Sequence, residues 1–184
     1  MKIEAQRMAG VDVQHRREKD DFYATPIHAI QALLDREKFE GQVYECACGN
    51  GAMSEVLISN GYDVYSSDLI NRGYGETGID FLKTEKQFDN IITNPPFKIG
   101  PDFILHSFKI AKKKIAIFGK LNFLEGKRRK RDIFSLGKLK KVYVFSGRVS
   151  FVKEGQTKSA GGLISFAWYI FEQNYNGLPQ IDWI

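Results

Sequence analysis

Four consecutive residues, Asn94-Pro95-Pro96-Phe97, carry groups that could orient an amino nitrogen for reaction. The two prolines hold the backbone carbonyls beside them rigid, outside any helix. An amino group on a base ring is a poor nucleophile because its lone pair is delocalised. The Asn94 side-chain oxygen and the Pro95 carbonyl could accept its two N–H bonds, while Phe97 stacks on the ring. The alternative interpretation is a stiff loop with a core phenylalanine.

A glycine turn, Cys48-Gly49-Asn50-Gly51, precedes this element in the chain. It lies between a strand and a helix, where a ligand can approach the backbone and free amide hydrogens are offered at the helix N-terminus. A dinucleotide-binding fingerprint would need a third glycine at position 54, where the chain has Ser54. The turn therefore disfavours a nicotinamide or flavin dehydrogenase.

Two carboxylates accompany the glycine turn. Glu45 lies in the strand before it, and Asp68 ends the next predicted strand, where an acid can accept both hydroxyls of a ribose. Either acid alone could be an ordinary capping or turn residue, but with the glycine turn they favour a nucleoside cofactor. Cys46 and Cys48 lack a neighbouring base in the sequence, so we interpret them as packing residues rather than redox groups.

The elements that must position these residues alternate between strands and helices. Strands are predicted at residues 43–47, 62–67, 88–93 and 115–118, and helices from Pro26 up to Gly41 and at 53–60 and 102–111. Thr25 is the expected N-cap of the first helix, and Gly41 is expected to close it. Further strands at 140–145, 149–152 and 163–171 predict antiparallel pairing in the C-terminal third. The pattern predicts a Rossmann-like, doubly wound α/β fold with a mostly parallel sheet.

Composition limits the class of protein. A chain of 184 residues, 43% of them hydrophobic, can close one core, so we expect a single domain over residues 1–184. The formal charge of +5 and a pI near 9.1 are compatible with a polyanionic partner. The polar N-terminus and the lack of long apolar runs predict a soluble cytoplasmic protein without a membrane partner. Two cysteines and three scattered histidines make a metal site unexpected.

The glycine turn and the Asn-Pro-Pro-Phe element together resemble the amino-methyltransferases of DNA, especially small adenine-specific enzymes of phage and prophage type. The resemblance covers nearly the whole chain. It implies a class I methyltransferase fold, S-adenosyl-L-methionine as cofactor, and the N6 amino group of adenine in DNA as target, with residues 94–97 catalytic. The segment from Asp21 to Pro26 is similar to the N-terminal cofactor motif of the family. By that resemblance, Tyr23 and Thr25 would contact the methionine part of the cofactor.

The same resemblance implies the other cofactor residues. Residues 45–51 match the family's acidic-Pro-x-x-Gly-x-Gly turn, except that Cys46 stands where proline is usual. Asp68 matches the ribose acid, and Asp80-Phe81 matches the pair that usually holds the cofactor's adenine. The expected cofactor-binding residues are therefore Tyr23, Thr25, Glu45, Ala47, Cys48, Gly49, Asn50, Gly51, Asp68, Leu69, Asp80 and Phe81.

A run of positive charges follows the fourth predicted strand, on the same sheet edge as Asn94 by topology. Phosphate contact and a solvated surface are equally good interpretations of this run, which comprises Lys127, Arg128, Arg129, Lys130 and Arg131. With Arg148 and the polar loop 153–162, it marks residues 120–162 as a candidate nucleic-acid-contacting segment inserted in the domain. Residues 112–114, three lysines on the opposite edge, are interpreted as promoting solubility. The expected partner is double-stranded DNA, bound by a monomer or a homodimer.

Three other functions remain open at this point. An RNA adenine methyltransferase would use the same tetrapeptide and a similar basic surface. A protein glutamine methyltransferase uses Asn-Pro-Pro-Tyr, so Phe97 and the basic run argue against it. A catalytically silent nucleic-acid-binding domain would not need Glu45, Asp68 and Asn94 intact.

Overall fold

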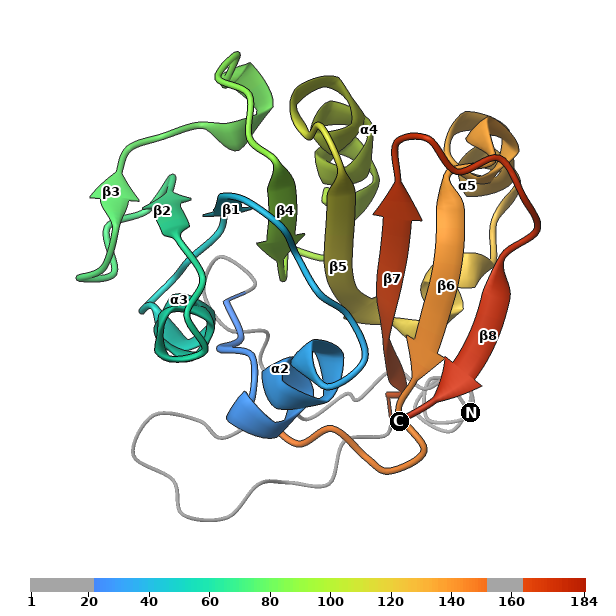
Figure 1. Cartoon of the computed structure of the whole chain (residues 1–184), viewed down its shortest axis with the longest axis horizontal. Helices are drawn as coiled ribbons and strands as arrows, with labels where there is room; N and C mark the ends of the chain where they lie inside the picture. The colour runs from blue at the N-terminus through green and yellow to red at the C-terminus, as the bar shows by residue number, and fades with distance from the viewer. Residues whose placement is uncertain (1–21, 152–163) are drawn as a thin grey trace, which may run out of the picture.

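The computed structural model describes residues 22–151 and 164–184, which form one mixed sheet with helices packed on it (Figure 1). The strands are β1 Val43–Glu45, β2 Val64–Asp68, β3 Glu76–Thr77, β4 Asn90–Thr93, β5 Lys114–Lys120, β6 Leu139–Val144, β7 Phe166–Glu172 and β8 Gln180–Trp183. The α-helices are α2 Ile27–Leu34, α3 Ala52–Ser59, α4 Gly100–Ile110 and α5 Lys127–Asp132. Short 3-10 helices are η2 Phe81–Lys83, η3 Leu121–Leu124 and η4 Phe134–Leu136.

The strand order across the sheet is β3-β2-β1-β4-β5-β7-β6-β8. Strands β1 to β5 pair in parallel, whereas β7 runs antiparallel to both β5 and β6. The Rossmann-like fold with antiparallel C-terminal pairing is therefore confirmed, and β8 adds a parallel edge strand beside β6. The order of winding reverses between β1 and β4, and open sheets of this kind bind ligands outside the carboxyl ends of their strands at such a point.

Helices cover both faces of the sheet, as the alternation of elements predicts. β5 alternates accordingly: Ala116 and Phe118 share a core cluster with α2 and α3, whereas Ile115 and Ile117 share the other cluster with α4. All four side chains are buried, which is typical of a central strand covered on both faces. Within the described ranges, no helix combines the length and apolarity needed to cross a membrane.

The first helix has different ends from those predicted. Its N-cap is Pro26, and Thr25 does not cap it, because the Thr25 hydroxyl instead accepts a hydrogen bond from Asn94. The helix ends at Leu34, well before Gly41. Gly41 lies in the turn before β1 with a φ of +88°, where an added Cβ would meet the Asp89 side chain at 2.2 Å.

The C-terminal third differs from the prediction at two points. Residues 149–151 form no strand, while Val152 and the predicted loop 153–162 lie outside the described residues. The edge strand β8 was not predicted, and all four of its residues are exposed.

Of the three lysines interpreted as promoting solubility, Lys114 has a structural role instead. Its ammonium group lies 2.6 Å from Glu37 and 3.5 Å from Glu172, so it links the segment after α2 to the sheet.

Candidate active site

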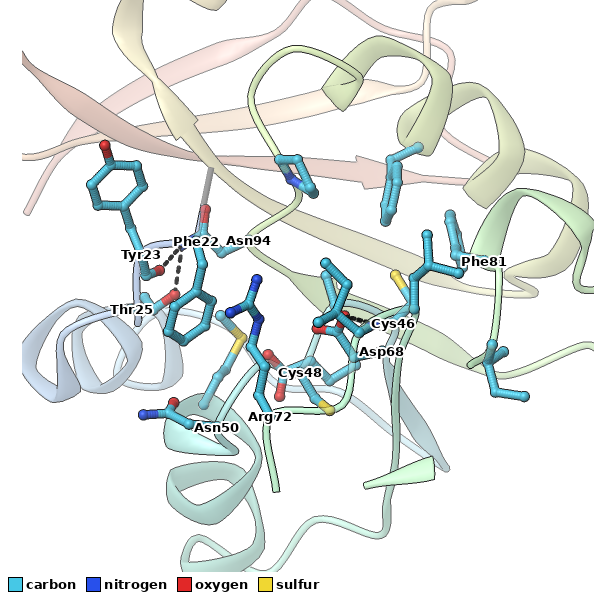
Figure 2. Close-up of a pocket in the computed structure, with 18 of the residues that line it drawn as sticks. Phe22, Tyr23, Thr25, Cys46, Cys48, Asn50, Asp68, Arg72, Phe81 and Asn94 are labelled. Atoms are coloured by element: carbon cyan, nitrogen blue, oxygen red, sulfur yellow. Dashed lines mark hydrogen bonds between the residues drawn. The ribbon is translucent and has the colours of Figure 1, made fainter. Parts of the chain in front are cut away.

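A pocket opens at the carboxyl ends of β1, β2 and β4, where the order of the strands reverses (Figure 2). It contains about 850 Å³ of empty space, including its open mouth. Every residue predicted to bind a cofactor lines this pocket except Gly49 and Gly51, and Asn94 and Pro96 line it as well. Phe22, Ala24 and Cys46 also line it and lie within the segments that resemble cofactor motifs, although they were not named as binding residues. The lining residues outside those segments that the sequence did not indicate are Ala52, Met53, Ile70, Arg72, Ile79, Leu82, Ile99 and Phe103.

The two glycines of the turn lie beneath aromatic rings, which explains why they do not line the pocket. Gly49 and Gly51 have φ values of +57° and +87°, a region that residues with a side chain rarely adopt. A Cβ added to Gly49 would come within 2.2 Å of the Phe22 ring, and one added to Gly51 within 2.3 Å of the Tyr74 ring. The turn therefore needs glycine for packing as well as for backbone conformation.

Asp68 fastens the glycine turn to the end of β2. Its Oδ2 accepts from the backbone amide of Gly49 at 2.8 Å, and its Oδ1 accepts from the amide of Ile70 at 2.9 Å. A carboxylate oxygen can accept more than one hydrogen bond, so both oxygens can still accept from a ligand hydroxyl. The geometry is compatible with the ribose-binding role that the resemblance implies.

Glu45 is a buried acid at the base of the pocket, with 2% of its surface exposed. The hydroxyl of Ser54 donates to its Oε2 and is itself 2.7 Å from the hydroxyl of Ser66. Burial raises the pKa of Glu45 to about 8, the hydrogen bond from Ser54 opposes that rise, and the nearby charge of Asp68 adds to it. Ser54, which occupies the third-glycine position of a dinucleotide fingerprint, therefore serves to hold Glu45.

The raised pKa of Glu45 makes stability fall as pH rises. The folded protein holds the Glu45 proton up to about pH 8, whereas the unfolded chain releases it near its ordinary value of 4.5, so unfolding releases a proton between these values. Glu45→Gln mimics the protonated acid. We expect the variant to match the wild type near pH 4 and to exceed its free energy of unfolding by about 5 kcal/mol above pH 8.

Urea unfolding at several pH values measures this difference. Glu55→Gln, on the exposed surface of the neighbouring helix α3, is the matched control and should show the pH dependence of the wild type. A difference between Glu45→Gln and the wild type that stays constant across this pH range would contradict the assignment of a protonated Glu45.

The two cysteines are buried and unpaired. Burial first, and then the nearby acids Glu45 and Asp68, raise the pKa of Cys46 well above its ordinary value and that of Cys48 to about 12. The thiols stay protonated at neutral pH, which supports packing rather than redox chemistry. Cys48 also donates a weak hydrogen bond from its thiol to the carbonyl of Tyr74 at 3.6 Å.

Asn94 directly follows β4 and is held by the segment before α2. Its amide nitrogen donates to the carbonyl of Tyr23 and to the hydroxyl of Thr25, both at 3.0 Å, as the dashed lines in Figure 2 show. Because these bonds use the amide hydrogens, the Asn94 oxygen is the acceptor left for an incoming N–H group. The segment that the sequence assigned to the cofactor thus orients the predicted catalytic amide.

The ring of Phe97 belongs to an aromatic group beside Asn94. Its centroid lies 6.3 Å from that of Tyr23, at 23° between the planes, and 5.9 Å from that of Phe166. The ammonium group of Lys120 lies 4.4 Å from the Phe97 centroid. A second pocket, with about 470 Å³ of empty space, borders this group and is lined in part by Pro95, Phe97, Lys120 and Arg129.

The opposite end of the first pocket is apolar. Phe81 is only 2% exposed and stacks on Phe103 at 4.6 Å between centroids, so it forms a wall of the pocket rather than a projecting group. Asp80 caps η2 by accepting from the amide of Leu82 at 3.1 Å, and its other oxygen pairs with Lys83 at 3.1 Å.

The basic run forms helix α5. Its exposed members are Lys127, Arg128, Lys130 and Arg131. Arg129 is half-buried and donates to the carbonyls of Asn122 and Glu125, so its role is at least partly structural. Arg128 lies 3.9 Å from Asp102 in the first turn of α4, the helix that follows the Asn-Pro-Pro-Phe element. The run therefore lies close to that element, and Arg148 is exposed after β6.

Comparison with known proteins identifies the fold. No family model matches the sequence, and no curated protein matches it. Among solved structures, the chain is similar to a presumed RNA methyltransferase from Pyrococcus horikoshii, with a TM-score of 0.64 and 16% identity over 92% of this chain and 96% of that one. It is also similar to a modification subunit of a presumed type I restriction enzyme from Vibrio vulnificus YJ016 (TM-score 0.65, 12% identity, 100% of this chain and 50% of that one). A third similar structure is magnesium protoporphyrin IX methyltransferase from Synechocystis PCC 6803 with bound SAM (TM-score 0.54, 15% identity, 79% of each chain). The chain has the class I methyltransferase fold.

Proposed function

We propose that this protein transfers a methyl group from S-adenosyl-L-methionine to the exocyclic N6 amino group of adenine in DNA. The observation that carries the proposal is the fixed amide of Asn94, held by Tyr23 and Thr25 beside a pocket at the reversal of the strand order. A side-chain amide with its nitrogen engaged presents its oxygen as an acceptor for an N–H donor.

The lining of the pocket fits a nucleoside that carries an amino acid. Asp68 can accept from ribose hydroxyls, while Ile79 and Phe81 give an apolar wall suited to a purine ring. The pocket extends from this wall to Asn94, so a ligand that fills it reaches the proposed catalytic residue. The fold that the chain shares with a methyltransferase containing bound SAM supports the same cofactor.

When bound, S-adenosylmethionine supplies an electrophilic methyl group on a sulfonium. The Asn94 oxygen and the Pro95 carbonyl accept the two hydrogens of the adenine amino group, which favours tetrahedral geometry at the nitrogen and takes its lone pair out of conjugation with the ring. The amino nitrogen held by Asn94 and Pro95 would take up the methyl group that the sulfonium supplies, and its surplus proton would then leave to solvent. Phe97 offers a stacking surface for a base swung out of the duplex.

The exposed side of α5 is the surface that we assign to the nucleic-acid backbone. Lys127 and Lys130 are exposed, and the helix lies beside the start of α4. Replacing both by alanine should lower DNA affinity about tenfold. The slope of log affinity against log salt concentration should become less steep by about 1–2, because each lost phosphate contact means one counterion fewer released on binding.

Fluorescence anisotropy with a labelled duplex at several salt concentrations measures both effects. Lys109→Ala with Lys112→Ala removes the same charge from exposed positions at the end of α4 and after it, and should change neither affinity nor slope. If the two double variants lose affinity equally, α5 has no special part in DNA binding.

The proposed reaction is tested with methyl-labelled S-adenosylmethionine and, separately, unmethylated duplex DNA, total RNA and a protein extract. Nucleoside analysis should find N6-methyladenine in the DNA. Label in RNA or in glutamine would support methyl transfer to an amino or amide nitrogen but show that the substrate is not DNA. Absence of label in all three, despite cofactor binding, would overturn the proposed transfer.

A further inference from the structure

Arg72 is a cation in a pocket whose other charged groups are acids. It is half-buried in the loop between β2 and β3 and lines the pocket together with Glu45, Asp68 and Asp80. Among the residues that the structure describes, no other lysine or arginine lines this pocket. Because burial keeps Glu45 protonated at neutral pH and the lining apart from Asp68 and Asp80 is apolar or neutral, Arg72 is the cation that a ligand carboxylate would meet in this pocket.

Contacts with Phe22 fix the position of Arg72 along the pocket. Its guanidinium carbon lies 4.3 Å from the centroid of the Phe22 ring, which covers Gly49. Phe22 precedes Tyr23, whose carbonyl holds Asn94. In Figure 2, Arg72 accordingly lies on the side of Tyr23 and Asn94, and Phe81 lies across the pocket from them.

The loop that carries Arg72 is itself packed on the glycine turn. Tyr74 lies against Gly51, and the thiol of Cys48 donates to the Tyr74 carbonyl. A Cβ added to Gly75 would come within 2.7 Å of the Ser66 carbonyl, so the loop passes close to β2. The guanidinium group therefore projects from a loop whose backbone is packed in place at Tyr74 and Gly75, just after Arg72, and its stacking on Phe22 restricts it further.

From this placement we propose that Arg72 binds the carboxylate of the methionyl part of S-adenosylmethionine. The inference rests on the proposed function, because the methyl group must reach Asn94 and the purine must therefore lie at the Phe81 end. The methionyl chain then lies at the end where Arg72 and Phe22 meet. Arg72 both neutralises the carboxylate and selects ligands that carry one.

The test compares two ligands that differ only at the carboxylate, S-adenosylmethionine and its decarboxylated analogue, by calorimetric titration in the absence of substrate. Arg72→Ala should weaken binding of S-adenosylmethionine about tenfold or more and change binding of the analogue less than about twofold. Arg72→Lys should recover part of the loss. Arg36→Ala removes an arginine ion-paired to Asp182 on another surface, and should bind both ligands as the wild type does.

Each remaining outcome would overturn the inference. An equal loss for both ligands would mean that Arg72 only shapes the pocket through Phe22, and no loss for either would mean that it does not contact the carboxylate. If the wild-type protein binds neither ligand, the assignment of S-adenosylmethionine as cofactor is itself wrong. Thermal unfolding of each variant shows whether a loss of binding comes from misfolding. If Arg72→Ala is misfolded, the comparison of the two ligands is made with Arg72→Lys instead.

Discussion

Replacing Asn94 by alanine is expected to abolish methyl transfer, a loss of at least about 10²–10³-fold, while the affinity for S-adenosylhomocysteine stays within about threefold of the wild type. The side chain contributes an oxygen that interacts with the amino group more strongly as its lone pair is freed, so its loss affects the chemical step. It contributes little to cofactor binding, because Asp68 and the apolar wall near Phe81 lie elsewhere in the pocket.

Single-turnover transfer and equilibrium binding of S-adenosylhomocysteine separate these two effects. Asn174→Ala, in the exposed turn after β7, is the matched control and should transfer at the wild-type rate. Asn94→Asp is a second probe: it keeps an acceptor oxygen but loses the donors to Tyr23 and Thr25, so it should retain part of the activity. Near-normal transfer by Asn94→Ala would remove the tetrapeptide from the mechanism.

Much of the fold could be predicted because its buried elements carry strong periodic patterns. The predicted strand at 88–93 contains β4, all of whose residues are buried. The edge strand β8 carries no such pattern, because its four residues are exposed and it joins the sheet through backbone pairing with β6. Local sequence cannot reveal a strand whose stability depends on a distant neighbour.

Long-range contacts explain the incorrect assignment at Thr25. By residue type and position it looks like an N-cap, since a proline follows it directly and the helix begins just beyond. Its hydroxyl is engaged by Asn94, 69 residues away in the chain, which removes it from the helix end. Lys114 is a similar case, because Glu37 and Glu172 approach it only after folding.

Apart from Tyr23 and Thr25, which precede α2, the site residues that could be predicted share one property. Each lies at the carboxyl end of a strand or in the segment after it, so topology alone brings Glu45, Asp68 and Asn94 together. Arg72 also follows a strand, β2, but it lies further from the strand end than Asp68 does. It lies within an irregular glycine-rich loop, whose path depends on the packing of Tyr74 on Gly51 and of the arginine on Phe22.

Asp68→Ala should lower the affinity for S-adenosylhomocysteine about 10²-fold, because a carboxylate that binds ribose hydroxyls forms charge-assisted hydrogen bonds of about 1.5–3 kcal/mol each. Part of that loss has another source, since Asp68 also accepts from the amides of Gly49 and Ile70 and so holds the glycine turn. Asp63→Ala, at an exposed position just before β2, is the control and should leave the affinity unchanged.

A ligand lacking the ribose 2′- and 3′-hydroxyls separates the two roles of Asp68. If the carboxylate binds the ribose, the wild type should bind the deoxygenated ligand far more weakly than S-adenosylhomocysteine, whereas Asp68→Ala should hardly distinguish them. If both proteins discriminate between the ligands equally, the ribose assignment is wrong and Asp68 acts only on the turn. Whatever loss Asp68→Ala shows toward the deoxygenated ligand measures the contribution of the turn, because no hydroxyl contact remains to be broken.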